Sequence, residues 1–543
     1  MIRISQRIAL LLFACMLSVG LSGCERNEQG EIAPAIPKAS VAENVDLPLK
    51  IDEQPSSVYY QIFIRSFNDS NGDSIGDLKG ITQKLSYLKE LGIEGIWLTP
   101  LNPSPSYHGF DVTDYYNVNP QFGTLDDFRE LMKEAHKQGI KVVMDLVLNH
   151  TSSKHPWFVD AMKGKDSPYR DWYVWTDETD PVKLSETSAT GGAAWHKKDN
   201  ATYLGVFWEG MPDLNFDNPQ VRKEMIKVGN FWLKQGVDGF RLDAAKHVYE
   251  DFQSSKGSKE VVEKNQAWWQ EFRKGIQETN PKAYLIGEVW DTASVVAPFL
   301  DHAFDSTFNF DLNKVLLSSA DTEKSSNLAN SLMRNYQLFA KASDSAFIDA
   351  PFLGNHDLDR VMSALNGNVD HAKMAASLLL TVPGNPFIYY GDEIGMKGRG
   401  QDENKREPML WYKSGKGEGQ TNWEPALSNG GSSQPSVEAQ LQDPESIYSH
   451  YKKLIDLRKR EPALRDGDIR SFEVSNPSIS AFVRMTVKEK VLVVHNLSGK
   501  EQMVEMKMSQ SDHFQTVAFS TKERVKLEDG KLTIPPYSTV ILK

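Results

Sequence analysis

The stretch Gly239-Phe-Arg-Leu-Asp-Ala-Ala-Lys-His247 begins with apolar residues and ends with charged and imidazole side chains. Residues 221–236 before it have a helix-like pattern, and the apolar run 237–242 predicts a buried strand. Arg241 and Asp243 are two residues apart, so their side chains point the same way on a strand. Two interpretations stay open. Asp243 lies at a strand end where parallel α/β folds place catalytic groups, or it caps a following helix beside a structural ion pair.

The pattern of this stretch recurs along the chain: a helix stops at a glycine, and a mostly apolar strand follows. The copies are Lys89–Leu98, Lys137–Leu146 and Lys234–Asp243. Further strand candidates are residues 58–64, 284–286, 303–304, 347–353 and 386–390. Buried parallel strands that alternate with helices predict a (β/α)8 TIM barrel, and three copies with five further candidates supply its eight strands.

Two other regions do not follow this pattern. Residues 150–214 are irregular and rich in Trp, and they predict a small inserted domain after the third strand. The barrel then comprises residues 51–149 and 215–462, with 446–460 as its last helix. In residues 463–543, short β-branched runs alternate with turns, which predicts a C-terminal antiparallel β-sandwich domain. The predicted fold class is therefore α/β.

The bulk composition limits the classes of partner. The chain has 543 residues, of which 40% are hydrophobic and 25% are charged, as in ordinary globular proteins. Its formal net charge of −12 argues against nucleic acid and against anionic membrane surfaces as partners.

The N-terminus has the features of an export signal. Two arginines precede the apolar run 8–20, and Leu21-Ser-Gly-Cys24 follows it. This order predicts a secretory signal peptide, since the run is too short to span a bilayer comfortably. The Leu-Ser-Gly-Cys ending resembles a bacterial lipobox, which implies removal of residues 1–23 and lipidation of Cys24; an ordinary signal peptide is the alternative. Residues 24–50 are typical of a flexible tether.

A loop after the first strand carries regularly spaced oxygen donors. It reads Asp69-Ser-Asn-Gly-Asp-Ser-Ile-Gly-Asp77. The predicted calcium ligands are Asp69, Asn71, Asp73, Ile75 and Asp77. The loop resembles only the first half of an EF-hand, because Ser74 and Gly80 replace the Gly and Glu of that motif. A turn that needs no metal is the alternative.

Four predicted strand ends carry polar clusters. These are Asp145 to His150, Arg241 to His247, Gly287-Glu-Val-Trp290 and Gly354-Asn-His-Asp357. Each cluster alone is a weak signal. At the carboxyl ends of one barrel they would face a common space.

Together these motifs resemble glycoside hydrolase family 13, the α-amylase family, over residues 58–543. The matching segments are Asp145-Leu-Val-Leu-Asn-His150, Met211-Pro-Asp-Leu-Asn215, Gly239 to His247, Gly287-Glu-Val-Trp290 and Phe352-Leu-Gly-Asn-His-Asp357. The resemblance implies retaining hydrolysis of an α-glucan. By it, Asp243 is the nucleophile, Glu288 is the general acid/base, and Asp357 binds the sugar and its transition state.

The resemblance also implies a set of substrate-binding residues. His108, His150 and His356 would contact the central sugar, and Phe110 stands where the family usually has a stacking Tyr. Lys246 and His247 would line the leaving-group side. Arg241 should keep Asp243 ionised.

A second structural calcium site is implied between barrel and insert. Its ligands would be Asn149, Asp213 and the backbone of His247.

The residue after the predicted nucleophile bears on linkage specificity. Ala244 after the nucleophile resembles enzymes that cleave α-1,4 bonds, which favours an α-amylase acting on starch or malto-oligosaccharides. The alternatives are an oligo-1,6-glucosidase, a neopullulanase-like hydrolase or a 4-α-glucanotransferase. A glucan-binding lipoprotein without activity is the non-enzymatic alternative. We expect an exported monomer whose lipid anchor is its one membrane attachment, on the outer membrane in a Gram-negative host, facing the periplasm or the cell surface.

Overall fold

The computed structural model describes residues 57–176, 181–249, 252–430, 435–506 and 512–543. The predicted signal peptide, Cys24 and the tether lie outside the described residues. Within them, no helix combines the length and the apolar character that a membrane crossing requires.

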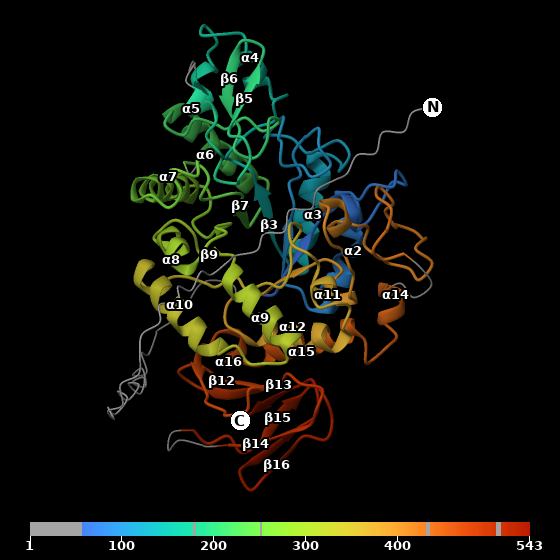
Figure 1. Cartoon of the computed structure of the whole chain (residues 1–543). Coiled ribbons are helices and arrows are strands. Elements are labelled where there is room, and N and C mark those ends of the chain that lie inside the picture. The colour runs from blue at the N-terminus through green and yellow to red at the C-terminus, as the bar shows by residue number, and fades with distance from the viewer. Residues whose placement is uncertain (1–56, 177–180, 250–251, 431–434, 507–511) are drawn as a thin grey trace, which may run out of the picture. The chain divides into compact units, whose positions relative to one another are not determined.

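The centre of the fold is one parallel sheet (Figure 1). Its seven strands, in spatial order, are β10 (Phe387–Tyr389), β1 (Tyr59–Ile62), β2 (Gly95–Leu98), β3 (Lys141–Leu146), β7 (Gly239–Leu242), β8 (Tyr284–Gly287) and β9 (Ser306–Thr307). Every pair within it is parallel. Nearly all of these residues are buried, which explains why the strands have continuous apolar runs.

The segment that closes the sheet into a barrel pairs only at single points. Phe308 forms a parallel bridge with Ala350, and Phe352 forms another with Phe387. The predicted strand 347–353 therefore occupies the seventh position of the ring without a continuous ladder. The strand predicted at 303–304 lies slightly later, at Ser306–Thr307. Ala303 and Phe304 are buried core residues, and burial alone produced the misleading apolar signal.

Helices flank the barrel strands (Figure 1). The long ones are α2 (Leu78–Leu91), α3 (Leu125–Lys137), α6 (Pro219–Lys234), α7 (Lys259–Gln277), α9 (Phe310–Thr322), α10 (Leu328–Ala342), α12 (Val369–Thr381) and α15 (Ile447–Arg460). Shorter helices also belong to this part or to the loops beside it: α1 (Ile64–Phe67), α8 (Ala293–Val296), α11 (Val361–Ala364), α13 (Asp402–Lys405), α14 (Val437–Gln440) and α16 (Pro462–Arg465). The short helices α4 (Pro156–Ala161) and α5 (Pro181–Leu184) lie in the insert (Figure 1).

Local sequence signals set the limits of these helices. Thr124 and Asp127 form the reciprocal capping box of α3. Ser446 caps α15, and α2 stops at Gly92, whose φ of 102° suits glycine. Helix α7 begins at Lys259 with Ser258 as its cap, so the interpretation of Asp243 as a helix cap is wrong.

The inserted region contains a small antiparallel sheet at the top of Figure 1. Its strands are β4 (Trp175–Thr176), β6 (Ala201–Leu204) and β5 (Trp195–Lys198), in that spatial order. An antiparallel bridge between His150 and Asp213 joins the start of the insert to its end.

The C-terminal part consists of two antiparallel sheets. One has the order β11 (Asp468–Ser471), β12 (Ile479–Met485), β13 (Lys490–Asn496), β18 (Ser538–Leu542) and β15 (Val517–Ser520). The other has β14 (Gln502–Glu505), β17 (Lys531–Ile534) and β16 (Lys526–Glu528). Alternate residues of β13 pack into two different hydrophobic clusters. Leu492 and Val494 pack between the sheets, and Val491 and Val493 pack in the barrel core. The predicted β-sandwich is confirmed.

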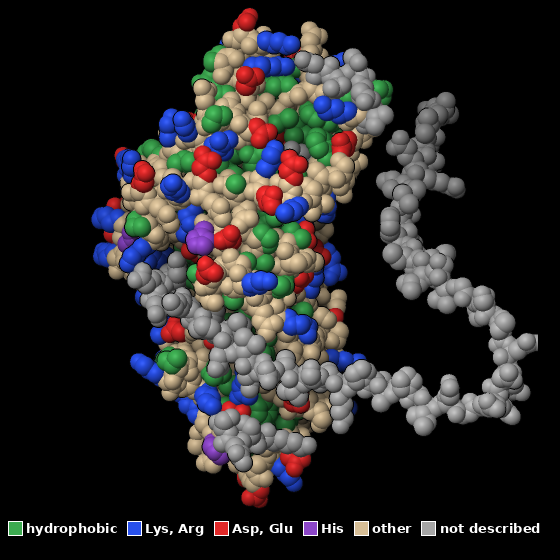
Figure 2. Space-filling view, turned by 90° about the vertical axis from the view of Figure 1, so that its left-hand side faces the viewer, with side chains coloured by type: hydrophobic (Ala, Val, Ile, Leu, Met, Phe, Trp, Pro, Cys, Tyr) green, Lys and Arg blue, Asp and Glu red, His purple; other side chains and the backbone are tan. Residues whose placement is uncertain are grey.

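The surface carries charges of both signs. On the face in Figure 2, basic and acidic side chains are interspersed instead of forming a large area of one sign.

Candidate active site

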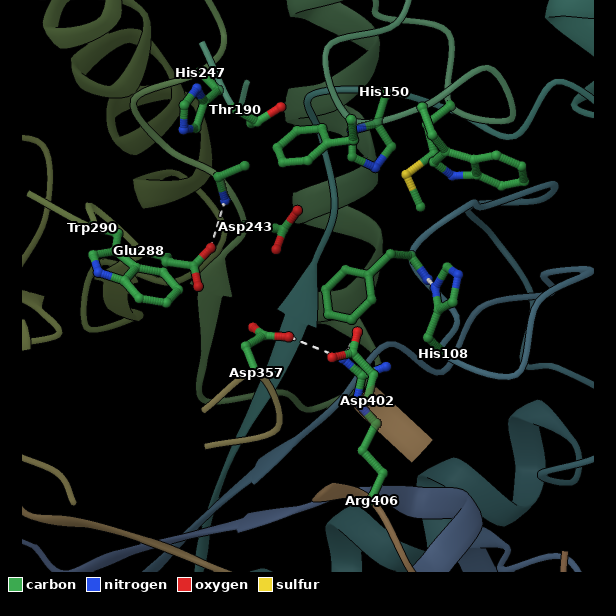
Figure 3. Close-up of a pocket in the computed structure, with 15 residues that line it drawn as sticks. His108, His150, Thr190, Asp243, His247, Glu288, Trp290, Asp357, Asp402 and Arg406 are labelled. Atoms are coloured by element: carbon green, nitrogen blue, oxygen red, sulfur yellow. Dashed lines mark hydrogen bonds and ion pairs between the residues drawn. The ribbon is translucent and has the colours of Figure 1, made fainter. Parts of the chain in front are cut away.

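A cavity of about 560 Å³ opens at the carboxyl ends of β3, β7 and β8 (Figure 3). Side chains of the barrel strand ends, the insert and the loop after β10 line it. They are His108, Phe110, His150, Thr190, Phe207, Trp208, Met211, Asp243, Ala244, His247, Glu288, Trp290, Asp357, Asp402 and Arg406. The three predicted catalytic carboxyls thus surround one space, although they come from distant parts of the chain.

The Arg241 guanidinium organises the floor of this cavity. Its Nη1 lies 2.8 Å from Asp145 and 2.5 Å from Asp243, and its Nη2 lies 2.6 Å from Glu288. Trp97 donates a further hydrogen bond to Asp145 at 3.1 Å. Because Nη1 and Nη2 belong to one planar group, Asp243 and Glu288 are held side by side.

Three carboxyls share this single cation. Burial raises the pKa of Asp243 well above its ordinary value; Arg241 lowers it, and Glu288 and Asp145 raise it further. Burial likewise raises the pKa of Asp145 to about 7, against the opposing effect of Arg241. Arg241 therefore favours the ionised form of Asp243, as expected, but burial and the two neighbouring carboxyls favour the protonated form. With all three carboxyls ionised, the buried cluster would carry an excess negative charge, so it favours retaining a proton.

The turn after β7 connects the two strand ends. Ala244 has a φ of 48°, and its N–H donates to the Glu288 carboxyl at 3.1 Å. The Ala245 N–H donates to the Glu288 carbonyl at 3.0 Å. The left-handed conformation of Ala244 therefore directs a backbone donor at the predicted acid/base.

Asp357 is held by the loop after β10. Its carboxylate accepts a hydrogen bond from Arg406 at 3.0 Å, and its backbone carbonyl accepts one from Lys405 at 2.8 Å. Its side chain is 34% exposed, compared with 10% for Asp243 and 14% for Glu288. The predicted sugar-binding carboxylate is thus the most accessible of the three.

His356 lies beneath the cavity with its outer nitrogen near Asp357. Gln61 donates to His356 Nδ1 at 2.8 Å, which leaves the ring proton on Nε2. That Nε2 is buried, has no hydrogen-bond partner among the described residues and lies 3.3 Å from Asp357. Phe110 stacks on the ring at 5.4 Å and 5°. Burial lowers the pKa of His356 well below its ordinary value, so the ring is a neutral donor.

The other predicted substrate contacts divide into two groups. His108, Phe110, His150 and His247 line the cavity, whereas Arg241, Lys246 and His356 lie behind its wall. Burial lowers the pKa of His150 to about 3, and its Nε2 has no partner among the described residues. The Lys246 ammonium contacts Asp291 at 2.8 Å.

Several lining residues were not predicted from the sequence. Thr190, Phe207, Trp208 and Met211 come from the insert, and Asp402 and Arg406 come from the loop after β10. Loops have no periodicity that reveals where a side chain points. Trp290 belongs to a recognised motif, and its exposed ring, stacked on Phe310 at 4.6 Å and 7°, forms a flat wall.

The predicted calcium loop turns around one carboxylate. The two oxygens of Asp69 accept backbone N–H groups at distances of 2.7 to 2.9 Å, from Asn71, Gly72 and Ser74. Asp69 is buried, so this carboxylate is oriented by the loop itself.

The remaining oxygens of the loop also accept backbone donors. Asp73 accepts from the Ile75 N–H at 2.8 Å. Asp77 accepts from the backbone of Ser70 and of Gly80, both at 2.7 Å, and so caps α2. Carboxylate, amide and carbonyl oxygens are the donors that Ca²⁺ takes. Within the described ranges, however, no three His, Cys, Asp or Glu side chains are grouped as metal ligands, and calcium stays a prediction.

Two residues of the second predicted site, Asn149 and Asp213, are in contact. Asn149 donates to the Asp213 carboxylate at 3.3 Å. Burial raises the pKa of Asp213 to about 8, against the opposing effect of a hydrogen bond from the Val206 backbone. The His247 N–H bonds to Ala244, and its ring lies edge-on to Phe207. A cation near Asp213 would fit the donor chemistry.

Comparisons with known proteins agree with this geometry. Residues 61–467 match the family description "Alpha amylase, catalytic domain", and residues 479–541 match "Alpha-amylase SusG C-terminal domain". Alpha-amylase 3 of Dictyoglomus thermophilum is 42% identical over 488 residues, 90% of this chain and 93% of that protein. A 4-alpha-glucanotransferase of Thermotoga maritima is 36% identical over 452 residues, 82% of this chain and 97% of that protein.

A solved structure extends the likeness to three dimensions. The crystal structure of alpha-amylase from H. orenii has a TM-score of 0.82 and 43% identity, covering 90% of this chain and 99% of that one. The shared barrel, the arrangement of carboxyls around one cavity and the matched length lead to one conclusion: this chain is an enzyme of glycoside hydrolase family 13, the α-amylase family.

Proposed function

We propose that this enzyme is a retaining α-glucan hydrolase of the α-amylase type that cleaves α-1,4 bonds in starch or malto-oligosaccharides. One observation carries the proposal: a single guanidinium holds Asp243 and Glu288 side by side at the cavity that Asp357 also lines. Retaining glycosidases need two carboxyls roughly 5–5.5 Å apart, one to attack and one to transfer the proton.

In the first step, an Asp243 oxygen attacks the anomeric carbon and the bond to the leaving oxygen breaks. Glu288 gives its proton to that oxygen, so a shortened glucan leaves with a free hydroxyl and the sugar stays bound to Asp243 as an ester. This step requires Glu288 to carry a proton and Asp243 to be ionised when the substrate binds. The Ala244 N–H fixes the position of the Glu288 carboxyl.

In the second step, the Glu288 carboxylate takes a proton from a water molecule. The water oxygen attacks the anomeric carbon, the ester bond breaks, and both carboxyls return to their starting states. Positive charge develops on the sugar ring in both transition states. The Asp357 carboxylate, held by Arg406, lies on the cavity wall where it would stabilise that charge.

Calcium would be a structural ion in this scheme. Asp69, Asn71, Asp73, the Ile75 carbonyl and Asp77 would hold it in the loop after β1, and Asn149, Asp213 and the backbone of His247 would hold a second one at the insert. When bound, the ion would supply charge neutralisation to these carboxylates.

The test is product analysis on soluble starch, pullulan and isomaltose, with each carboxyl replaced in turn. We expect cleavage of starch with retention of the α configuration. Asp243→Asn should lower kcat by several orders of magnitude while maltoheptaose still binds. Cleavage of isomaltose but not starch would favour an oligo-1,6-glucosidase, and products from pullulan alone would favour a neopullulanase-like hydrolase.

A second candidate, 4-α-glucanotransferase activity, is favoured by a specific feature. Among the described Phe and Trp side chains, those exposed are Phe207 at 37%, Trp208 at 45% and Trp290 at 47%, and all three line the cavity. Trp290 follows Glu288, which serves the leaving group, so its ring could hold an acceptor sugar in place of water. Malto-oligosaccharides longer than the substrate would indicate transfer, and Trp290→Ala should then shift the products toward hydrolysis.

We further propose export and lipidation at Cys24. The order of basic, apolar and small residues before Cys24 supports it. Labelling cells with a radioactive fatty acid tests it, because Cys24→Ser should abolish incorporation.

A further inference from the structure

Arg406 fixes Asp357 and its neighbour at more than one point. Besides the Asp357 carboxylate, its guanidinium donates to the His356 carbonyl at 2.9 Å. Lys405 adds a hydrogen bond to the Asp357 carbonyl. Arg406 itself is only 3% exposed, so its position depends on the groups packed around it.

Two groups outside the cavity wall support Arg406. The Tyr107 hydroxyl accepts a hydrogen bond from its Nη1 at 3.0 Å. The Ser66 hydroxyl donates to its backbone carbonyl at 2.5 Å. One contact orients the guanidinium, and the other fixes the backbone.

Trp423 contacts both supports. Its ring stacks on Tyr107 with centroids 5.3 Å apart and an angle of 23°, and its Nε1–H donates to Ser66 Oγ at 2.8 Å. Trp423 does not line the cavity. It can therefore influence the chemistry only through the residues that it holds.

The segment that carries Trp423 is also tied to the loop after β1. The Asp69 N–H donates to the Gly419 carbonyl, and the Asn422 N–H donates to the Ser74 carbonyl, both at 2.9 Å. An added Cβ at Gly419 would lie 2.1 Å from the Asn68 side chain, so this close packing requires a glycine.

We propose that Trp423 is a positioning residue for Asp357, acting through Tyr107, Ser66 and Arg406, and that it connects the 69–77 loop to the catalytic carboxylates. The inference rests on the proposed role of Asp357 in the transition state. Loosening Trp423 then lets the Asp357 carboxylate move relative to the sugar. Because Asp357 acts mainly in the transition state, kcat should fall and KM should change little.

The test compares Trp423→Leu, Trp423→Phe and Tyr107→Phe in the full-length enzyme, with kcat and KM measured on maltoheptaose. We expect Trp423→Leu to lower kcat on the order of tenfold, as misplacement of a catalytic group does. Trp423→Phe, which keeps a stacking ring, should recover part of the loss. The double variant Trp423→Leu with Tyr107→Phe should lose less than the product of the single losses, because both changes act on Arg406.

Trp411→Leu is the matched control. Trp411 is a buried neighbour that donates to the Phe67 carbonyl at 2.6 Å and contacts neither Tyr107 nor Ser66 in the described hydrogen bonds and ring contacts. It should lower the unfolding temperature without lowering kcat. Equal kcat values for the two leucine variants, or fully multiplicative losses, would overturn the inference; if Trp423→Leu does not fold, Trp423→Phe and Tyr107→Phe decide it. Wild-type turnover in Asp357→Asn would instead refute the proposed catalytic role.

Discussion

Arg241 Nη2 lies 2.6 Å from the Glu288 carboxyl, so the predicted acid/base is held by the same guanidinium that contacts the predicted nucleophile. The arrangement explains why a residue that does not line the cavity is central to it. Loss of Arg241 would therefore affect three buried carboxyls together.

Replacement of Arg241 by Met should therefore have a pH-dependent cost. Removing one partner of a buried charge cluster typically costs about 3–5 kcal/mol of unfolding free energy. Without the cation, the pKa values of Asp145 and Asp243 rise further, so the lost stability should be largest above pH 7 and smaller near pH 5, where these carboxyls bind protons. Urea unfolding at the two pH values measures this. Arg273→Met, which breaks a pair with Asp305 away from the cavity, should show a weaker dependence.

Acid should destabilise the enzyme through its buried histidines. Burial lowers the pKa of His495 to about 3, and its ring bonds to Thr539 and Thr381. A histidine with a depressed pKa stabilises the fold above its unfolded pKa of about 6.5, and this contribution is lost as pH falls toward the folded value, at up to about 1.4 kcal/mol per pH unit. His495→Gln should flatten the loss of unfolding free energy between pH 6 and 4. The exposed His513→Gln should leave that slope unchanged.

The contact between barrel and C-terminal sheets should be sensitive to two arginines. Arg458 donates to the carbonyls of Leu380 and Val382, and Arg484 donates to those of Thr381 and Gly467. These include the last carbonyls of α12, where a cation also complements the helix dipole. Arg484→Met leaves buried carbonyl acceptors without their donor. We therefore expect a loss of roughly 2–4 kcal/mol in unfolding free energy, with kcat unchanged.

Thermal unfolding measures the loss of stability, and a starch assay measures kcat for the same variants. A solvent-facing arginine, Arg465, provides the comparison: its pair with Asp466 is half exposed, and Arg465→Met should cost less than about 1 kcal/mol. Similar losses for both variants would contradict the assigned role of the buried carbonyl contacts.

Calcium should raise the unfolding temperature if either predicted site binds it. Free Ca²⁺ at about 100 times its dissociation constant would add roughly 2.7 kcal/mol. Asp73→Ala should remove the contribution of the 69–77 loop, and Asp213→Asn should remove that of the insert. Calorimetry with calcium and with a chelator separates the two sites. An unfolding temperature that does not respond to calcium in the wild type would exclude both.

The barrel could be predicted because its signals are local. The capping box at Thr124, the glycine stop at Gly92 and the buried strands each depend on neighbours in sequence. The three carboxyls that line the cavity could be located for a related reason, since each follows a strand whose end the apolar run marks. Their common environment could not, because Asp145 meets Arg241 only after β3 and β7 pair.

The parts that sequence did not reveal depend on long loops. Arg406 lies 49 positions after Asp357, and nothing in its surroundings predicts that its guanidinium reaches that carboxylate. The same holds for Phe207 and Trp208 of the insert. The pKa of Asp243 was difficult to predict for a different reason. Arg241 lowers it as expected, but burial, Glu288 and Asp145 raise it, and these effects depend on the folded structure.

The bridges at Ala350 and Phe352 have a consequence for how activity responds to heat. The segment that leads to Asp357 has isolated bridges and separate backbone hydrogen bonds to its neighbours instead of a continuous ladder. Asp357 itself, beyond the last of these, is held by Arg406 and Lys405. Warming should release these few contacts before the continuous ladders separate. Catalytic activity would then be lost reversibly at a temperature some degrees below the unfolding temperature of the barrel. Substitutions in a surface loop could raise or lower this upper working temperature without altering the sheet.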